Sequence, residues 1–285
     1  MPYSRPAALV STDWLGTHLN APDVRVVDGT YFTRESGRDA LAEYKTCHIP
    51  GAVHFDIDEI AESGSDLPHM LPTPDKFSSR MRSKGLGDGN RIVVYDAHGL
   101  FSAARVWWML RVFGHRDVAV LDGGLPKWLA ERRPVEDLPP VPRLRHFNAT
   151  YDHTLVHEAE QILANLTSQS EQIIDARSSE RFKGTIAEPW PGRRLGHIPG
   201  SLNLPYTELF DPKNGTMLPA DELMARFQAA GVDLSRPITT TCGSGITACV
   251  LALALHQIGR DDVAVYDGAW AEWGLRQDLP TAVAA

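Results

Sequence analysis

The stretch that decides the fold is residues 237–258, which read PITTTCGSGITACVLALALHQI. The β-branched residues 238–241 predict a short buried strand, and the apolar run 247–258 predicts a helix. The residues between them, Cys242-Gly-Ser-Gly-Ile, predict a tight strand-to-helix loop, because glycine adopts backbone angles that other residues resist. Backbone N–H groups in such a loop can turn inward, beside the positive end of the helix.

The place of Cys242 in this loop favours a reactive thiolate, because inward N–H groups and a helix N-terminus both stabilise negative charge. Isolated cysteines are more often small buried apolar residues. That structural interpretation suits Cys249, inside the predicted helix, and Cys47, which has no glycine loop beside it. For Cys242 the loop favours chemistry, and we expect it to be the nucleophile.

Four landmarks occur twice in the same order: a strand ending in aspartate, a His-Ile-Pro-Gly motif, a strand leading into a loop, and an Asp-Gly turn followed by tryptophan. The matched segments are 25–28 and 173–177, 48–52 and 197–201, 91–96 and 237–242, and 117–124 and 262–269. Their order and nearly constant offset predict a duplicated domain. We expect an N-terminal domain over 8–134, a linker over 135–152 and a C-terminal domain over 153–285.

Within each half, short apolar strands alternate with helical stretches such as 103–113 and 248–258. This alternation predicts an α/β fold in which each domain has a mostly parallel sheet covered by helices on both faces. The linker is proline-rich without apolar periodicity, which predicts a stiff extended connection. Two such domains packed together leave a cleft, a common place for an active site.

The duplication also allows an internal comparison of the two loops. Where the second half has Cys242-Gly-Ser-Gly, the first has Asp96-Ala-His-Gly. A carboxylate is no sulfur nucleophile, and its charge opposes an anion in the loop. We therefore expect a non-catalytic N-terminal domain that forms one wall of the cleft and contributes side chains to it.

Composition restricts the classes of function. The chain has 285 residues, 43% of them hydrophobic and 22% charged, as in ordinary soluble proteins. The net charge of −8 argues against a nucleic-acid or anionic-membrane surface. The three cysteines have no disulfide or zinc spacing, and no nucleotide-binding glycine motif is present, so we expect no metal and no cofactor. Without a signal-peptide core or a membrane-spanning stretch, a cytoplasmic location is expected.

These motifs resemble those of the two-domain rhodanese family of sulfurtransferases over nearly the whole chain. The resemblance rests on both His-Ile-Pro-Gly segments, Arg105-Val-Trp-Trp-Met, both Asp-Gly turns and the cysteine loop. Within the family, Cys-Gly-Ser-Gly-Ile-Thr-Ala is similar to the uncharged loop of 3-mercaptopyruvate sulfurtransferases. Thiosulfate sulfurtransferases usually carry basic side chains in that loop.

The resemblance implies a two-step reaction with a small anionic sulfur donor. The Cys242 thiolate attacks the sulfur of 3-mercaptopyruvate, pyruvate leaves, and a thiol acceptor such as thioredoxin, or cyanide, takes the sulfur from the persulfide. The loop residues Gly243, Gly245, Ile246 and Thr247 would bind the substrate and hold the persulfide charge through their N–H groups.

Further roles follow from the same resemblance. Arg181 matches the family arginine that binds the substrate carboxylate, a contact that suits a planar guanidinium. Ser244 matches the loop serine of the mercaptopyruvate enzymes. Asp58 and His69 match residues proposed to handle protons with that serine; the structural alternative is that they cap or brace a loop.

One departure concerns a second family arginine that follows Glu-Pro. This chain has Trp190 there, and Arg193 and Arg194, shortly after it, are candidates for the missing position. If neither reaches it, carboxylate binding rests on Arg181 and the choice between mercaptopyruvate and thiosulfate stays open.

Two other classes of protein are possible. A dual-specificity phosphatase would need an arginine in a C-x5-R loop, where this chain has Ala248, so that class is disfavoured. A sulfur carrier or binding protein would use the same loop without rapid turnover.

Overall fold

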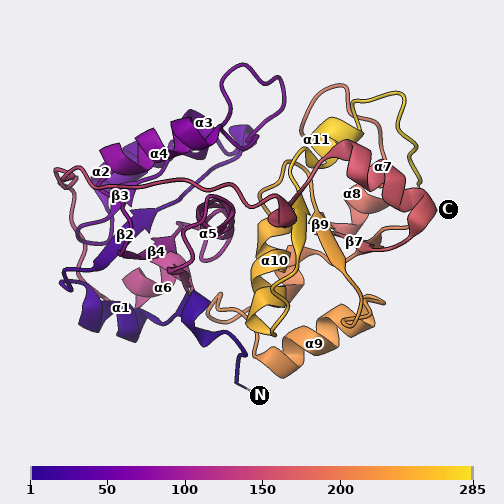
Figure 1. Ribbon diagram of the computed structural model, residues 1–285. Coiled ribbons are helices and arrows are strands. Elements are labelled where there is room, and N and C mark those ends of the chain that lie inside the picture. The colour runs from indigo at the N-terminus through magenta and orange to yellow at the C-terminus, as the bar shows by residue number, and fades with distance from the viewer. Residues whose placement is uncertain (1, 284–285) are drawn as a thin grey trace.

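The computed structural model describes residues 2–283 and shows two similar α/β domains side by side (Figure 1). Each domain holds a five-stranded sheet, with strand orders β1-β5-β4-β2-β3 and β6-β10-β9-β7-β8. Every strand pairing in both sheets is parallel. The repeated order confirms the predicted duplication and the α/β class.

The strands of the first sheet are β1 Leu9–Val10, β2 Val24–Asp28, β3 Val53–His54, β4 Arg91–Tyr95 and β5 Val118–Leu121. Those of the second are β6 Val156–His157, β7 Gln172–Asp175, β8 Leu202–Asn203, β9 Ile238–Thr241 and β10 Ala264–Tyr266. The strand predicted at 238–241 is confirmed as β9.

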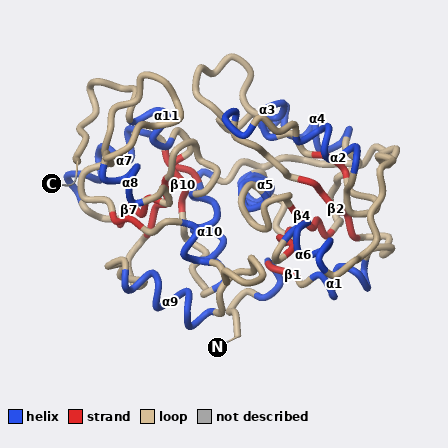
Figure 2. Tube along the Cα trace, turned by 180° about the vertical axis from the view of Figure 1, so that it is seen from behind, coloured by secondary structure: helices blue, strands red, loops and turns tan. Residues whose placement is uncertain are grey.

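Helices enclose both sheets, as the view from behind also shows (Figure 2). In the N-terminal domain they are α1 Thr12–His18, α2 Ala40–Thr46, α3 Ile57–Ile60, α4 Pro74–Ser83, α5 Ala103–Val112 and α6 Gly124–Ala130. In the C-terminal domain they are α7 Ala159–Ser168, α8 Ser179–Lys183, α9 Ala220–Ala229, α10 Ala248–Gln257 and α11 Ala269–Trp273. The 3-10 turns are η1 Pro6–Ala8, η2 Arg34–Ser36, η3 His153–Leu155 and η4 Tyr206–Leu209.

Helices α5 and α10 contact each other at the centre of the molecule, between the two sheets (Figures 1 and 2). Every residue of both helices is buried. A helix that is apolar on all sides is stable only when it is covered on all sides, and here the second domain supplies the missing cover. One hydrophobic core therefore runs through both domains and fixes their relative position.

The connection between α6 and η3 runs along the N-terminal domain (Figure 1). It contains no helix and no strand of either sheet. Asp88 N donates to His146 O at 2.9 Å, and Phe147 is buried against the ring of Phe77. The second half of the connection is thus packed onto the domain rather than free in solvent.

Candidate active site

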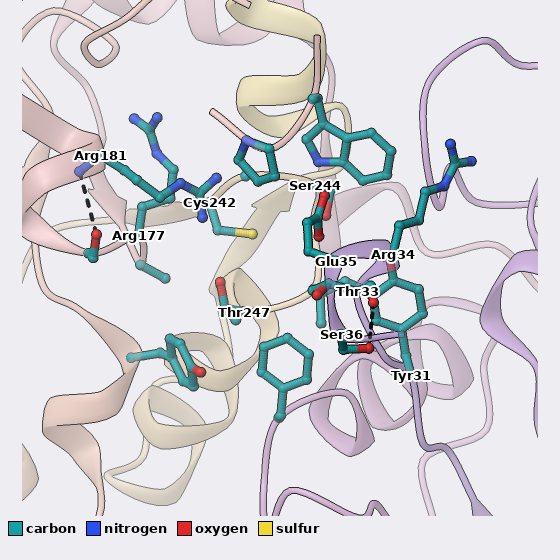
Figure 3. Close-up of a pocket in the computed structure, with 18 of the residues that line it drawn as sticks. Tyr31, Thr33, Arg34, Glu35, Ser36, Arg177, Arg181, Cys242, Ser244 and Thr247 are labelled. Atoms are coloured by element: carbon teal, nitrogen blue, oxygen red, sulfur yellow. Dashed lines mark hydrogen bonds between the residues drawn. The ribbon is translucent and has the colours of Figure 1, made fainter. Parts of the chain in front are cut away.

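The Cys242 loop lies at the carboxyl end of β9, the end at which parallel sheets commonly bind ligands. Cys242 is only 2% exposed and lines a cavity of about 690 Å³ between the two domains. Its sulfur points into that space, with Arg181 on one side and Tyr31 and Arg34 of the N-terminal domain on the other (Figure 3). The sequence-predicted nucleophile therefore faces a cleft.

Backbone contacts hold the loop in shape. Trp270 N donates to Cys242 O at 2.9 Å, and Ala271 N donates to Gly243 O at 2.8 Å, so the start of α11 fixes the loop carbonyls. Gly245 has φ +80°, and a Cβ there would lie 3.0 Å from both Arg105 Nη1 and Asp267 O. This position therefore requires glycine on both conformational and steric grounds.

The Asp96 loop shows what such a loop does with negative charge. The fully buried carboxylate of Asp96 accepts four backbone N–H groups: those of His98 (2.8 Å) and Gly99 (3.0 Å) on Oδ1, and those of Phe101 (2.7 Å) and Ala103 (2.8 Å) on Oδ2. The N-terminal loop is thus an anion site that its own aspartate fills, so these four donors are not available to a substrate.

The Cys242 loop offers three of the four equivalent donors and has no internal anion. In the described part of the chain, the N–H groups of Ser244, Gly245 and Thr247 donate to no protein acceptor. Gly243, Ser244, Ile246 and Thr247 line the cavity with Cys242, whereas Gly245 lies behind them against Arg105. The loop is therefore built to hold a negative charge at the cysteine sulfur.

Arg181 lies directly over this loop. It is part of the short helix α8, whose first turn is capped by the Ser178 hydroxyl. A Cβ added to Gly243 would lie 2.4 Å from Arg181 Nη2, so the missing side chain is what lets the guanidinium approach. Arg181 lines the cavity and is 24% exposed, so the predicted carboxylate anchor and the predicted nucleophile lie in the same cavity.

Glu188 holds Arg181 in place. Its carboxylate accepts Arg181 Nη2 at 2.5 Å and Nε at 3.2 Å, and it also accepts Arg177 Nη1 at 2.8 Å. Arg177 is buried and pairs with Asp175 at 2.6 Å. Within the described residues Arg181 Nη1 has no protein acceptor, so one face of the guanidinium remains available to a ligand. The sequence analysis did not predict these roles, although Arg177 ends the repeated segment 173–177 and Glu188 belongs to the Glu-Pro pair before Trp190.

Asp58 and His69 form the expected pair but stand back from the cavity. His69 Nδ1 lies 2.7 Å from Asp58 Oδ1, and this hydrogen bond lowers the pKa of Asp58. The His69 ring is buried and makes edge contacts with Tyr31 and Trp190, which do line the cavity. Among the described residues, no hydrogen bond joins either member of the pair to Ser244.

Arg193 and Arg194 do not reach the cavity, which corrects the expectation that one of them fills the missing position. Arg193 donates to Ala271 O and Pro191 O. Arg194 donates to four backbone carbonyls at and beyond the end of α11, those of Trp273, Gly274, Arg276 and Leu279. The carbonyls at and beyond the end of α11 attract guanidinium donors, and they hold the Arg194 side chain and one edge of the Arg193 side chain away from the cavity.

The cation opposite Trp190 comes instead from the N-terminal domain. Arg34, in η2, lines the cavity, and its guanidinium carbon lies 5.7 Å from the centre of the Trp190 ring. Trp190 itself lines the cavity and touches both Arg34 and His69 across the domain boundary. No motif pointed to Arg34, because only the docking of the two domains brings it to the site.

A buried cross-domain network supports the loop from behind. Arg105, at the start of α5, is fully buried and donates to Asp267 Oδ1 at 2.6 Å, to Gly245 O at 3.2 Å and to His69 O at 2.5 Å. Asp267 also accepts the N–H of Leu71 at 2.8 Å. The network joins the Cys242 loop to the N-terminal segment that carries His69.

The other Asp-Gly turn makes a similar contact in the opposite direction. Asp122, of the N-terminal domain, accepts the N–H of Met217 in the C-terminal domain at 2.8 Å. Burial raises the pKa of Asp122 to about 6. Both aspartates of the repeated turns therefore cross the interface, so the duplication has produced a pseudo-symmetric contact between the domains.

Aromatic rings form much of the remaining wall. The cavity is also lined by residues that the sequence analysis did not single out, among them His98, Phe101, Tyr206, Pro189 and Pro191.

In residues 2–283 there is no group of three or more histidine, cysteine, aspartate or glutamate side chains that could hold a metal ion. The same part of the chain has no helix with the length and apolar character needed to cross a membrane.

Comparisons with known proteins agree with this architecture. A family model of the rhodanese-like domain matches residues 11–131 and again residues 158–276. The 3-mercaptopyruvate sulfurtransferase of Escherichia coli K12 is 42% identical over 272 residues, which cover 95% of this chain and 96% of that protein. The human 3-mercaptopyruvate sulfurtransferase is also 42% identical, over 94% of this chain and 92% of that protein.

A thiosulfate sulfurtransferase from Cricetulus griseus is 44% identical over 93% of this chain and 91% of its own length. Among solved structures, SseA from Escherichia coli, described as a 3-mercaptopyruvate sulfotransferase with the rhodanese fold, matches with a TM-score of 0.85. That match has 39% sequence identity and covers 93% of this chain and 99% of the other. The chain therefore belongs to the rhodanese family, as a sulfurtransferase with two rhodanese-like domains in tandem.

Proposed function

We propose that the protein takes a sulfur atom from 3-mercaptopyruvate, holds it as a persulfide on Cys242, and passes it to a thiol acceptor such as thioredoxin. One observation carries the proposal: Cys242, an uncharged glycine loop with unpaired N–H groups, and Arg181 meet in one cavity. A loop without cationic side chains suits a donor with a single carboxylate, which Arg181 would bind.

The first half-reaction follows from this geometry. With its carboxylate on Arg181, the donor presents its sulfur to the Cys242 thiolate. The new bond is the S–S bond, and the bond that breaks joins the donor sulfur to carbon 3. The electron pair of that bond passes to carbon as the enolate of pyruvate, which takes up a proton. The loop N–H groups then stabilise the persulfide anion on Cys242.

Proton delivery to the enolate would be the task of Ser244, supported by His69 and Asp58. The Asp58 hydrogen bond occupies Nδ1 of His69 and so fixes the orientation of the ring. The other ring nitrogen, Nε2, is buried and has no hydrogen-bond partner among the described residues. A small movement of the Tyr31 and Trp190 walls on donor binding would open a path from Nε2 to the cavity.

Thiosulfate as the preferred donor is the second candidate, and Arg34 is the observation that favours it. This arginine brings a second cation to the cavity, where the indole of Trp190 stands in place of the expected arginine. A doubly charged donor gains more from two separated guanidinium groups than a donor with one carboxylate does.

The deciding experiment is steady-state sulfur transfer to cyanide, with kcat/KM compared for the two donors. The proposal expects mercaptopyruvate to be favoured by at least an order of magnitude, because kcat/KM reports discrimination between donors. A preference for thiosulfate would contradict it and select the second candidate.

Cys242→Ser tests the persulfide directly. We expect the variant to lose turnover and to keep its melting temperature, because the change replaces one buried atom at a loop. Mass spectrometry of the native chain after incubation with donor should find one added sulfur atom on the peptide that contains Cys242. Cys249→Ser is the matched control and should still become persulfidated. A donor-treated chain that carries the sulfur elsewhere would contradict the mechanism, and a persulfide that small thiols and cyanide discharge only slowly would indicate a carrier.

A reducing compartment suits this chemistry, and we take it to be the cytoplasm. All three cysteines, Cys47, Cys242 and Cys249, are free in the structure. Relatives differ in location, since one from Arabidopsis thaliana is named as mitochondrial. Fractionation of cells that express the native protein would test the assignment, and recovery with an organelle or an envelope fraction would contradict it.

A further inference from the structure

A second cavity, of about 470 Å³, lies on the N-terminal domain, and we call it the linker cavity. The linker forms one wall through residues 140–143 and Arg145, and the first half of β2, from Val24 to Val26, forms another. The active-site loops follow the carboxyl ends of the strands, whereas this cavity lies at the amino end of β2. The two cavities share no lining residue, so the linker cavity is not an extension of the active site.

Four cations line the linker cavity: Arg25, Lys84, Arg143 and Arg145. No aspartate or glutamate is among the described residues that line it, in a chain whose net charge is −8. Arg25 donates to Val24 O, Lys84 donates to His54 O, and none of the four forms a salt bridge within residues 2–283. Positive charge is thus concentrated here without a protein counter-charge in contact.

This concentration carries an electrostatic cost. Burial and the nearby charge of Arg145 lower the pKa of Arg25, and Asp23 opposes the effect only in part. Burial also lowers the pKa of Lys84, and the nearby charge of Arg80, outside the cavity, adds to this effect, whereas Glu59 and Asp56 oppose it. A bound anion would relieve the repulsion between Arg25 and Arg145, and it would supply acceptors for the N–H groups of the four cations.

The duplicated domain provides a comparison, because the C-terminal domain has a cavity at the same place. Pro199, Gly200, Leu202 and Gly231 line it, as Pro50, Gly51, Val53 and Gly85 line the linker cavity. That counterpart is smaller, about 290 Å³, and its charged lining residues are one glutamate, Glu171, and one arginine, Arg236.

The comparison extends to the position of Arg25. Counting back three residues from the aspartate that ends each strand, Arg25 corresponds to Gln172. The Gln172 amide is paired with the backbone of Asp233, at 2.7 Å and 2.8 Å. The same fold in the C-terminal domain thus has a neutral side chain at the position of Arg25, hydrogen-bonded to the protein's own backbone. The fold therefore does not require the four cations of the linker cavity.

We propose that the linker cavity binds a compact polyanion of the phosphate class, with Arg25 and Lys84 inside it and Arg143 and Arg145 closing over it from the linker. The cavity volume lies within the usual range for small-molecule sites. Guanidinium and ammonium groups are the usual donors to phosphate oxygens. The four positive charges exceed the charge of a single sulfate or phosphate, so they suit a chain of linked phosphates better. Bound polyanion would tie the linker to β2.

Titration calorimetry on the full-length chain tests the proposal, with inorganic triphosphate as the ligand used and sulfate as the comparison anion. We expect saturable binding with one site per chain, and affinity for sulfate at least tenfold weaker. The double variant Arg143→Ala, Arg145→Ala should bind triphosphate with a dissociation constant raised on the order of tenfold or more, because it lacks two charged contacts. Both side chains are exposed, so the fold should be kept.

Arg236→Ala, in the counterpart cavity, is the matched control and should bind triphosphate as the native chain does. Sulfur transfer by the double variant should equal that of the native chain, which separates this site from the active site. Absence of saturable triphosphate binding, equal affinity in the double variant, or equal loss in Arg236→Ala would each overturn the proposal. None of these results depends on which sulfur donor the active site prefers.

Discussion

The buried carboxylate of Asp96 gives the sharpest test of the view that these loops are anion sites. In Asp96→Asn the amide oxygen can keep one pair of the four N–H donors, while the amide NH2 group faces the other pair. Two buried N–H groups then lose their acceptors, at about 1–3 kcal/mol each, and the remaining two bonds lose their ionic character. We expect the free energy of unfolding to fall by about 3–6 kcal/mol.

Urea denaturation followed by circular dichroism at neutral pH measures this change. Asp66→Asn is the control, because Asp66 is exposed and its carboxylate caps no loop, and it should alter stability by less than about 0.5 kcal/mol. If Asp96→Asn also falls within about 1 kcal/mol of the native chain, the loop does not depend on a charge at its centre. The same reasoning would then fail for the persulfide on Cys242.

Three further predictions concern the site and its supports. Arg181→Lys should raise KM for mercaptopyruvate about tenfold with a smaller effect on kcat, because an ammonium group cannot make the bidentate contact with a carboxylate. Steady-state kinetics measures both constants, and an unchanged KM would exclude Arg181 as the carboxylate anchor. Asp267→Asn leaves the buried guanidinium of Arg105 without its counter-charge and should lower the free energy of unfolding by about 3–5 kcal/mol. A change below about 1 kcal/mol, measured by urea denaturation, would show that the cross-domain network is dispensable for stability. The pKa of Asp58 is lowered in the fold, so the stability that this group contributes is present above the unfolded pKa of about 4 and is lost as pH falls through the folded value. Asp58→Asn should therefore flatten the acid limb of the curve of unfolding free energy against pH. An acid limb identical to that of the native chain would refute the pairing of Asp58 with His69.

Local sequence patterns predicted the parts of the molecule that local physics controls. The β-branched run of β9 and the Ala/Leu-rich run of α10 have strong intrinsic preferences, and they form where the patterns indicate, α10 beginning one residue later and ending one residue earlier than predicted. The repeated landmarks predicted the two sheets, because similar residues at matched positions form and pack the same elements in each half. Cys242 could be predicted as a site residue, and it lines the cavity, because the glycines beside it indicate a tight loop whatever its tertiary surroundings.

The errors and omissions concern side chains whose partners lie far away in the sequence. Arg193 and Arg194 were placed by nearness to Trp190 in the chain, but carbonyls at the end of α11 capture them. Arg34 reaches the cavity only because α5 and α10 dock the domains together. Long flexible cations bind whatever acceptor tertiary structure brings near, so sequence spacing alone does not determine their targets.

The two loops together explain why the N-terminal domain has an aspartate, rather than an arbitrary residue, at the position of Cys242. A loop that turns several N–H groups toward one point is stable only if an anion, or water, satisfies them. In the C-terminal domain the anion would be transient, a thiolate or persulfide on Cys242. In the N-terminal domain it is permanent, because Asp96 carries its own charge into the same position. A neutral side chain there would leave buried donors unpaired, so the charge of Asp96 maintains the conformation of its loop.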